Sequence, residues 1–69
     1  MDIDLDKVIN ECGIEVGIDR ITPIIAEKIR AYKNNRDEKT AQELTELLKD
    51  RENIYNFDKE TIKKYIKLD

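Results

Sequence analysis

The sequence predicts an all-α protein, a compact bundle of three to four short helices with a central antiparallel helical hairpin. Apolar residues recur at helical spacing along most of the chain, and good capping residues precede these segments. The charge also alternates along the chain. Residues 1–19 hold one basic and six acidic residues, residues 20–36 five and one, residues 37–52 three and six, and residues 53–69 four and three. Neighbouring helices packed antiparallel would therefore attract each other, and 69 residues allow one helical domain, residues 1–69.

The first helix is expected over residues 5–12, because four apolar residues there share one helix face: Leu5, Val8, Ile9 and Cys12. Asp2 or Asp4 would cap its start, and Gly13 would end it in the left-handed conformation. Cys12 is expected to be a small buried hydrophobic residue. Residues 14–21 alternate apolar and polar side chains. A single strand is not stable alone, so we expect an extended or partly helical connector there.

The second helix is expected to begin at Thr22, with Pro23 in its first turn, where a missing N–H costs nothing. Asn34 and Asn35 would end it, because asparagine tolerates the left-handed conformation. Its inner face is expected to hold Ile24, Ile25, Ile29 and Tyr32.

The third helix is expected to begin at Asp37 and to end near Asn53 or Tyr55, with an apolar stripe formed by Ala41, Leu44, Leu47 and Leu48. The fourth helix would take Asp58 as its N-cap, with Phe57 and Ile62 placed as a hydrophobic staple. Its inner face would hold Ile62, Tyr65 and Ile66.

Catalysis has little support in this composition, and we expect a protein that is not an enzyme and needs no cofactor. The chain has no histidine, and its two glycines, Gly13 and Gly17, do not fit a dinucleotide-binding or phosphate-binding loop. Asp2, Asp4 and Asp6 resemble the opening of a calcium-binding loop, but the rest of that loop is missing. We therefore expect no metal site.

A partner protein, or a second copy of the chain, is the expected source of additional stability. A chain of this size has a small core and usually gains a disulfide, a metal or an association. The single cysteine cannot form an internal disulfide. No segment has the length and apolarity of a membrane span, and the acidic start does not resemble a secretion signal, so we expect a cytoplasmic protein with no membrane partner.

The favoured functional hypothesis is a small non-catalytic protein–protein interaction module, an adaptor, regulator or inhibitor that acts by occupying a surface. Apolar residues that a small core does not cover usually mark such a surface. The residues expected to bind the partner are Val16, Ile18, Ile54, Tyr55 and Phe57.

The alternative hypothesis is a small DNA-binding regulator that resembles a helix-turn-helix protein and uses the helix at about residues 58–68. The side chains that would face DNA are Thr61, Lys63, Lys64 and Lys67. Two features weaken this alternative. The join over residues 51–57 is long and lacks glycine, and the preceding helix is acidic and would repel phosphates.

Overall fold

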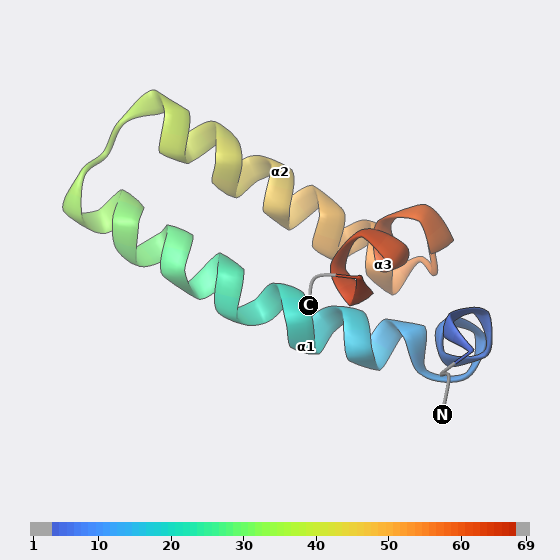
Figure 1. Ribbon diagram of the computed structural model, residues 1–69. Coiled ribbons are helices and arrows are strands. Elements are labelled where there is room, and N and C mark those ends of the chain that lie inside the picture. The colour runs from blue at the N-terminus through green and yellow to red at the C-terminus, as the bar shows by residue number, and fades with distance from the viewer. Residues whose placement is uncertain (1–3, 68–69) are drawn as a thin grey trace.

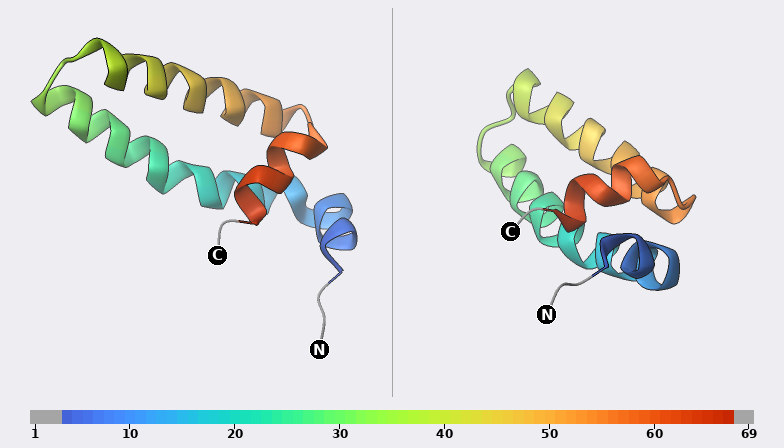
Figure 2. Two further views of the ribbon diagram at one scale, coloured as in Figure 1. Left: turned by 45° about the horizontal axis from the view of Figure 1, so that its top comes forward. Right: turned by 45° about the vertical axis from the view of Figure 1, so that its right-hand side comes forward.

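The computed structural model describes residues 4–67, which form three helices and no strand: α1 (Leu5–Asn34), α2 (Glu38–Tyr55) and α3 (Lys59–Ile66). The all-α class expected from the sequence is therefore confirmed. α1 and α2 lie side by side and run in opposite directions (Figure 1). α3 packs over the end of this pair that is formed by the first half of α1 and the end of α2, as two further views show (Figure 2).

The expected connector over residues 14–21 is wrong, because this segment lies inside α1 and is helical throughout. Thr22 is consequently not an N-cap. Its hydroxyl instead donates a hydrogen bond to the Ile18 carbonyl, one turn earlier, at 2.7 Å. Pro23 lies within the helix rather than at its first position, so the helix lacks one backbone hydrogen bond there. Thr22 and Pro23, which locally favour the start of a helix, therefore lie in the middle of one.

Packing explains why the chain stays helical there. Every fourth residue of α1 from position 9 to position 25 is buried, namely Ile9, Gly13, Gly17, Ile21 and Ile25. The two glycines admit their neighbours very closely. A Cβ atom added to Gly17 would lie 3.0 Å from Cγ2 of Ile54, and one added to Gly13 would lie 3.3 Å from Cγ2 of Ile62. Both glycines thus belong to the inner row of a helix, and tertiary packing outweighs the local preference for a break.

A kink at Cys12 is what remains of the expected break after the first helix. Cys12 has φ −144° and ψ 24°, outside the helical region. Gly13 is not left-handed as expected, since neither glycine of the chain has a positive φ. Cys12 is half-buried rather than fully buried. The turns before the kink bend toward α3, where Lys63 Nζ lies 3.9 Å from Oδ1 of Asp6.

Aspartates precede all three helices, as the sequence predicts. Asp4 Oδ1 accepts the backbone N–H of Asp6 at 3.1 Å, whereas Asp2 lies outside the described residues. Asp37 Oδ1 accepts the N–H of Thr40 at 2.6 Å. This backbone hydrogen bond is the main reason that the pKa of the Asp37 carboxyl is lowered.

The other expected helix boundaries are confirmed with small differences. α1 ends at Asn34, but Asn35 has φ −145° and is extended rather than left-handed. Asp58 is the N-cap residue of α3, yet its carboxylate accepts the hydroxyl of Thr61 at 2.8 Å instead of a backbone N–H. The sequence therefore predicts the helix boundaries well where a polar capping residue lies next to a loop.

The turn between α2 and α3 contains the one non-glycine residue with positive φ in the described range, Phe57, at φ 60°. The Phe57 N–H donates to the Ile54 carbonyl at 3.0 Å, and the Asp58 N–H donates to the Asn53 carbonyl at 2.9 Å. These two bonds form a Schellman motif, in which glycine usually holds the left-handed position. An L-residue in this conformation costs about 1–2 kcal/mol.

α3 is held by an apolar face and by a polar contact at its edge. Ile62, Tyr65 and Ile66 are all buried, as expected. The Tyr65 hydroxyl donates to Oδ2 of Asp50 on α2 at 2.6 Å, and Lys64 Nζ lies 3.1 Å from the same oxygen. Burial, and then the bond to Asp50, raises the pKa of Tyr65 well above its ordinary value of 10.0.

The ion pairs follow the alternation of charge along the sequence. Lys28 on α1 pairs with Glu43 on α2 at 3.1 Å, and Lys64 on α3 pairs with Asp50 on α2. Each pair joins a basic segment to an acidic one. Exposed pairs of this kind contribute little to stability, so their main effect is on which helices lie together.

Candidate interaction surface

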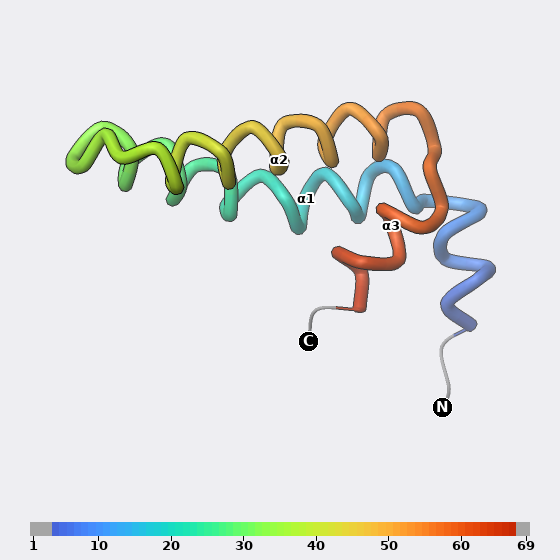
Figure 3. Tube along the Cα trace, turned by 90° about the horizontal axis from the view of Figure 1, so that it is seen from above, coloured from blue at the N-terminus to red at the C-terminus, as the bar shows by residue number. Residues whose placement is uncertain are grey.

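The two sides of the α1–α2 layer differ. α3 and the first turns of α1 lie on one side of the layer, and no segment of residues 4–67 lies over the other side (Figure 3). Residues that meet α3 include Asp6 and Gly13 on α1 and Asp50 on α2. The uncovered side is therefore built from the remaining faces of the same two helices.

Apolar side chains gather on this uncovered side. Ile14 and Ile18 of α1 and Tyr55 of α2 line one shallow hollow, with Glu15 and Asp19 at its edge. Helical spacing extends the set in both helices. Ile29 follows Ile18 by 11 residues, about three turns, and Leu48 precedes Tyr55 by seven residues, about two turns. We call the surface formed by Ile14, Ile18, Ile29, Leu48 and Tyr55 the open face.

The open face exposes large apolar side chains. Leu48 is 47% exposed, Ile29 40% and Tyr55 51%. The Arg51 guanidinium carbon lies 5.1 Å from the centre of the Tyr55 ring, so one face of this ring is stacked by a cation. An apolar stripe rimmed by charges is typical of a protein-binding surface.

The structure brings together two of the five predicted partner-binding residues, Ile18 and Tyr55. Ile54 lies elsewhere, since it is fully buried against Gly17. Val16 is half-buried beside the core, as Ile18 is, but it lies about 200° around α1 from Ile18 and so on another side of the helix. Phe57 is 37% exposed and sits in the turn, with Lys59 Nζ 5.8 Å from its ring centre.

Ile29 and Leu48 of the open face were not predicted from the sequence as members of a surface. Ile29 and Leu48 were both assigned to inner stripes. The available signal was the width of those stripes, because Leu47 and Leu48 are adjacent and point in directions about 100° apart. A stripe that wide covers two neighbouring surfaces, of which a thin layer buries only one.

Most of the residues of the DNA-binding alternative have partners within the chain. Lys64 pairs with Asp50, Lys63 approaches Asp6, and the Thr61 hydroxyl donates to Asp58. Lys67 is exposed at the end of α3. Three of the four side chains are thus directed toward carboxylates rather than presented together on a free basic surface.

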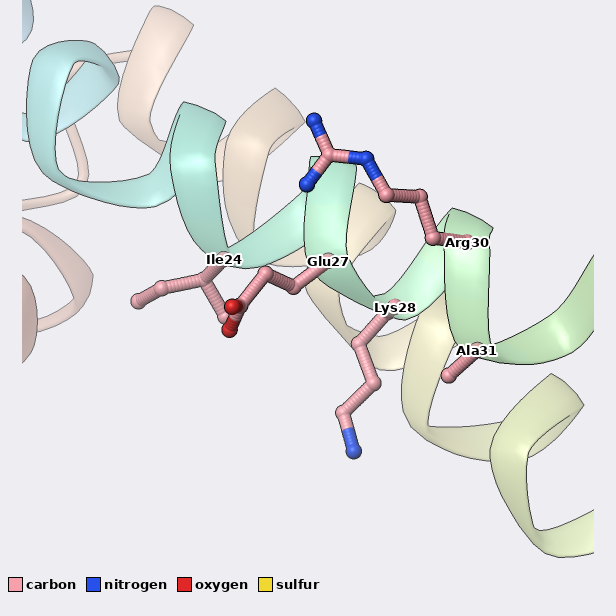
Figure 4. A pocket seen from close by; sticks show the side chains of 5 residues that line it. All are labelled: Ile24, Glu27, Lys28, Arg30 and Ala31. Atoms are coloured by element: carbon pink, nitrogen blue, oxygen red, sulfur yellow. The ribbon is translucent and has the colours of Figure 1, made fainter.

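Other hollows of the described surface are shallow; most are of mixed charge, and one on α2 has acidic side chains without a basic one. One lies on α1 alone and is lined by Ile24, Glu27, Lys28, Arg30 and Ala31, with the Arg30 side chain pointing away from the others (Figure 4). Lys28 of this set is paired with Glu43. Within residues 4–67 no group of three potential metal-binding side chains is present. None of the described helices is long and apolar enough to span a membrane.

Comparisons of the chain with models of protein families, with curated proteins and with solved structures found no match.

Proposed function

We propose that this protein is a small, non-catalytic protein-interaction module of the cytoplasm that works by occupying a partner's surface with its open face. The observation that carries the proposal is the difference between the two sides of the α1–α2 layer. α3 covers one side, whereas Ile29, Leu48 and Tyr55 remain exposed on the other. Covering these side chains would gain roughly 25 cal/mol per Å² of apolar surface.

The charged rim of the open face fits this role. Glu15 and Asp19 border the hollow between Ile18 and Tyr55, and Arg51 stacks on the Tyr55 ring. Rim charges of this kind set the orientation of a partner and the rate of encounter, while the apolar centre supplies the affinity. A helix or a helical pair that presents an apolar stripe is the partner shape that such a flat face accepts.

The test compares two variants that add the same charge to exposed positions of α2. Leu48→Glu places a carboxylate in the open face, and Gln42→Glu places one outside it. The immobilised chain is incubated with nuclease-treated lysate of its source, and recovered proteins are quantified. We expect a stoichiometric protein with the native chain and with Gln42→Glu, and at least a tenfold loss with Leu48→Glu. Equal recovery by both variants would refute the proposal.

The purified native chain also tests the DNA-binding alternative. Binding of the native chain to a labelled mixed-sequence duplex is followed by fluorescence anisotropy at rising salt. We expect no binding at physiological salt. Binding that weakens steeply with salt and disappears in Lys63→Glu/Lys67→Glu would replace the interaction module by the DNA-binding hypothesis.

A further inference from the structure

Ile18 and Ile29 of the open face belong to a run along α1 whose spacing matches its own reverse. Ile18, Thr22, Ile25 and Ile29 follow one another at intervals of four, three and four residues, the spacing of a helix–helix seam. Glu15 precedes this run and Lys33 follows it. If a second α1 runs antiparallel along the first, Ile18 meets Ile29, the exposed Thr22 lies level with the largely buried Ile25, and Glu15 comes within one residue of the level of Lys33.

The α2 side has a stripe whose centre and two ends match on reversal. Ala41, Leu44, Leu48, Arg51 and Tyr55 are spaced three, four, three and four residues apart. Run against itself, the stripe places Leu48 opposite Leu48 of the other copy and places the small Ala41 opposite the large Tyr55. Leu44 comes within one residue of the level of Arg51, a side chain that covers apolar surface while its charge stays in water.

Both helices would share one two-fold axis. The reversed α1 pattern is centred between residues 23 and 24, and the reversed α2 pattern is centred on Leu48. Within one chain, Gly17 faces Ile54 and Lys28 faces Glu43. Seven residues along α1 from Gly17 is Ile24, and seven residues back along α2 from Ile54 is Leu47, so Ile24 and Leu47 lie level. The two centres therefore coincide to within about one residue, or about 1.5 Å.

Charge favours the same arrangement. The first half of α1 is acidic and its second half is basic. An antiparallel second copy brings Glu15 of each chain near Lys33 of the other, twice per dimer. A two-fold contact is self-complementary by necessity, and a charge gradient along one helix satisfies this condition only in the antiparallel direction.

We infer that the open face is covered by a second copy of this chain, packed antiparallel so that α1 lies along α1 and α2 along α2 in a four-helix layer pair. This inference rests on the proposed function, because it names the partner of the same face. It also supplies the association that a small core with no disulfide calls for.

The first measurement is the mass in solution by light scattering after size exclusion, at about 10 to 200 μM chain. We expect twice the 8.2 kDa chain mass for the native protein and for Gln42→Glu, and the single mass for Leu48→Glu. Circular dichroism should show unchanged helicity, since Leu48 is half exposed. A native chain that stays monomeric at 200 μM overturns the inference.

Cross-linking then tests the axis, in a Cys12→Ala background. Leu48→Cys should form a disulfide dimer on mild oxidation, because residue 48 lies on the axis. Ile18→Cys alone should not, since its copy would lie about 16 Å away along the helix. A mixture of Ile18→Cys and Ile29→Cys chains should cross-link. Self-cross-linking at position 18, or none at position 48, contradicts the antiparallel arrangement.

A charge exchange tests the predicted rim contact. Lys33→Glu should weaken the dimer about tenfold, because it turns two attractions with Glu15 into repulsions, and Glu15→Lys/Lys33→Glu should restore it. A double variant as weak as the single one contradicts this pairing. Finally, a monomeric native chain whose Leu48→Glu variant still loses a captured protein would overturn the second copy and leave the proposed function standing.

Discussion

The two sides of the α1–α2 layer are made from the same kinds of residues, yet α3 covers only one of them. On the α3 side, Gly13 permits the close approach of the fully buried Ile62, just as Gly17 admits the fully buried Ile54 between α1 and α2. On the open side, Leu48 and Tyr55 lie two turns apart on one face of α2 and stay about half exposed. An apolar stripe therefore becomes core only where another segment covers it.

The largest difference between the two sides should appear on truncation of a buried and an exposed aliphatic side chain. Ile54→Ala removes a fully buried side chain and should lower the free energy of unfolding by about 3 kcal/mol. Leu48→Ala should change it by less than about 0.5 kcal/mol in the monomer. Urea unfolding at low micromolar concentration measures both, and equal losses would erase the distinction between the two sides.

The polar edge of the covered side gives the next largest effect. Tyr65→Phe removes the hydroxyl that Asp50 accepts at 2.6 Å, which should cost about 2 kcal/mol near neutral pH. The folded state also keeps Tyr65 protonated, because its pKa is raised above the ordinary 10.0. The stabilisation is thus complete below about pH 10 and is lost as the pH rises further.

Urea unfolding at pH 8 and at pH 11 separates this contribution from the remaining tyrosines. The native chain should lose stability between these values, and Tyr65→Phe should lose less of it. Parallel losses in the two proteins would show that another group causes the alkaline sensitivity.

The smallest effect concerns the turn that delivers α3 to its side of the layer. Phe57 is left-handed, so Phe57→Gly should be more stable than Phe57→Ala by about 1 kcal/mol. Glycine and alanine both delete the ring and its contact with Lys59, so their difference isolates the backbone conformation. The opposite order, which is normal for a residue outside a left-handed position, would show that the turn relaxes in solution.

Local chemistry in the sequence determined much of this protein. The helical class, the ends of α1 at Asn34 and of α2 at Tyr55, the capping aspartates 4 and 37, and the buried face of α3 could all be predicted. Each depends on residues within a few positions of one another, through capping or through the helical period. The alternation of charge likewise anticipated the pairs between α1 and α2 and between α2 and α3.

Only the tertiary structure decided the course of residues 13–25 and the identity of the exposed apolar residues. Gly13, Thr22 and Pro23 read locally as helix ends, but Ile54 and Ile62 need the space beside the two glycines, and this long-range packing keeps α1 continuous. Ile54 and Tyr55 are adjacent in sequence, yet one is core and the other lies on the open face. Ile54 is buried because it faces Gly17 of α1 between the two helices, whereas Tyr55, about 100° around α2, lies on the side that no described segment covers. These contacts join residues far apart in the chain, so no local pattern predicts them.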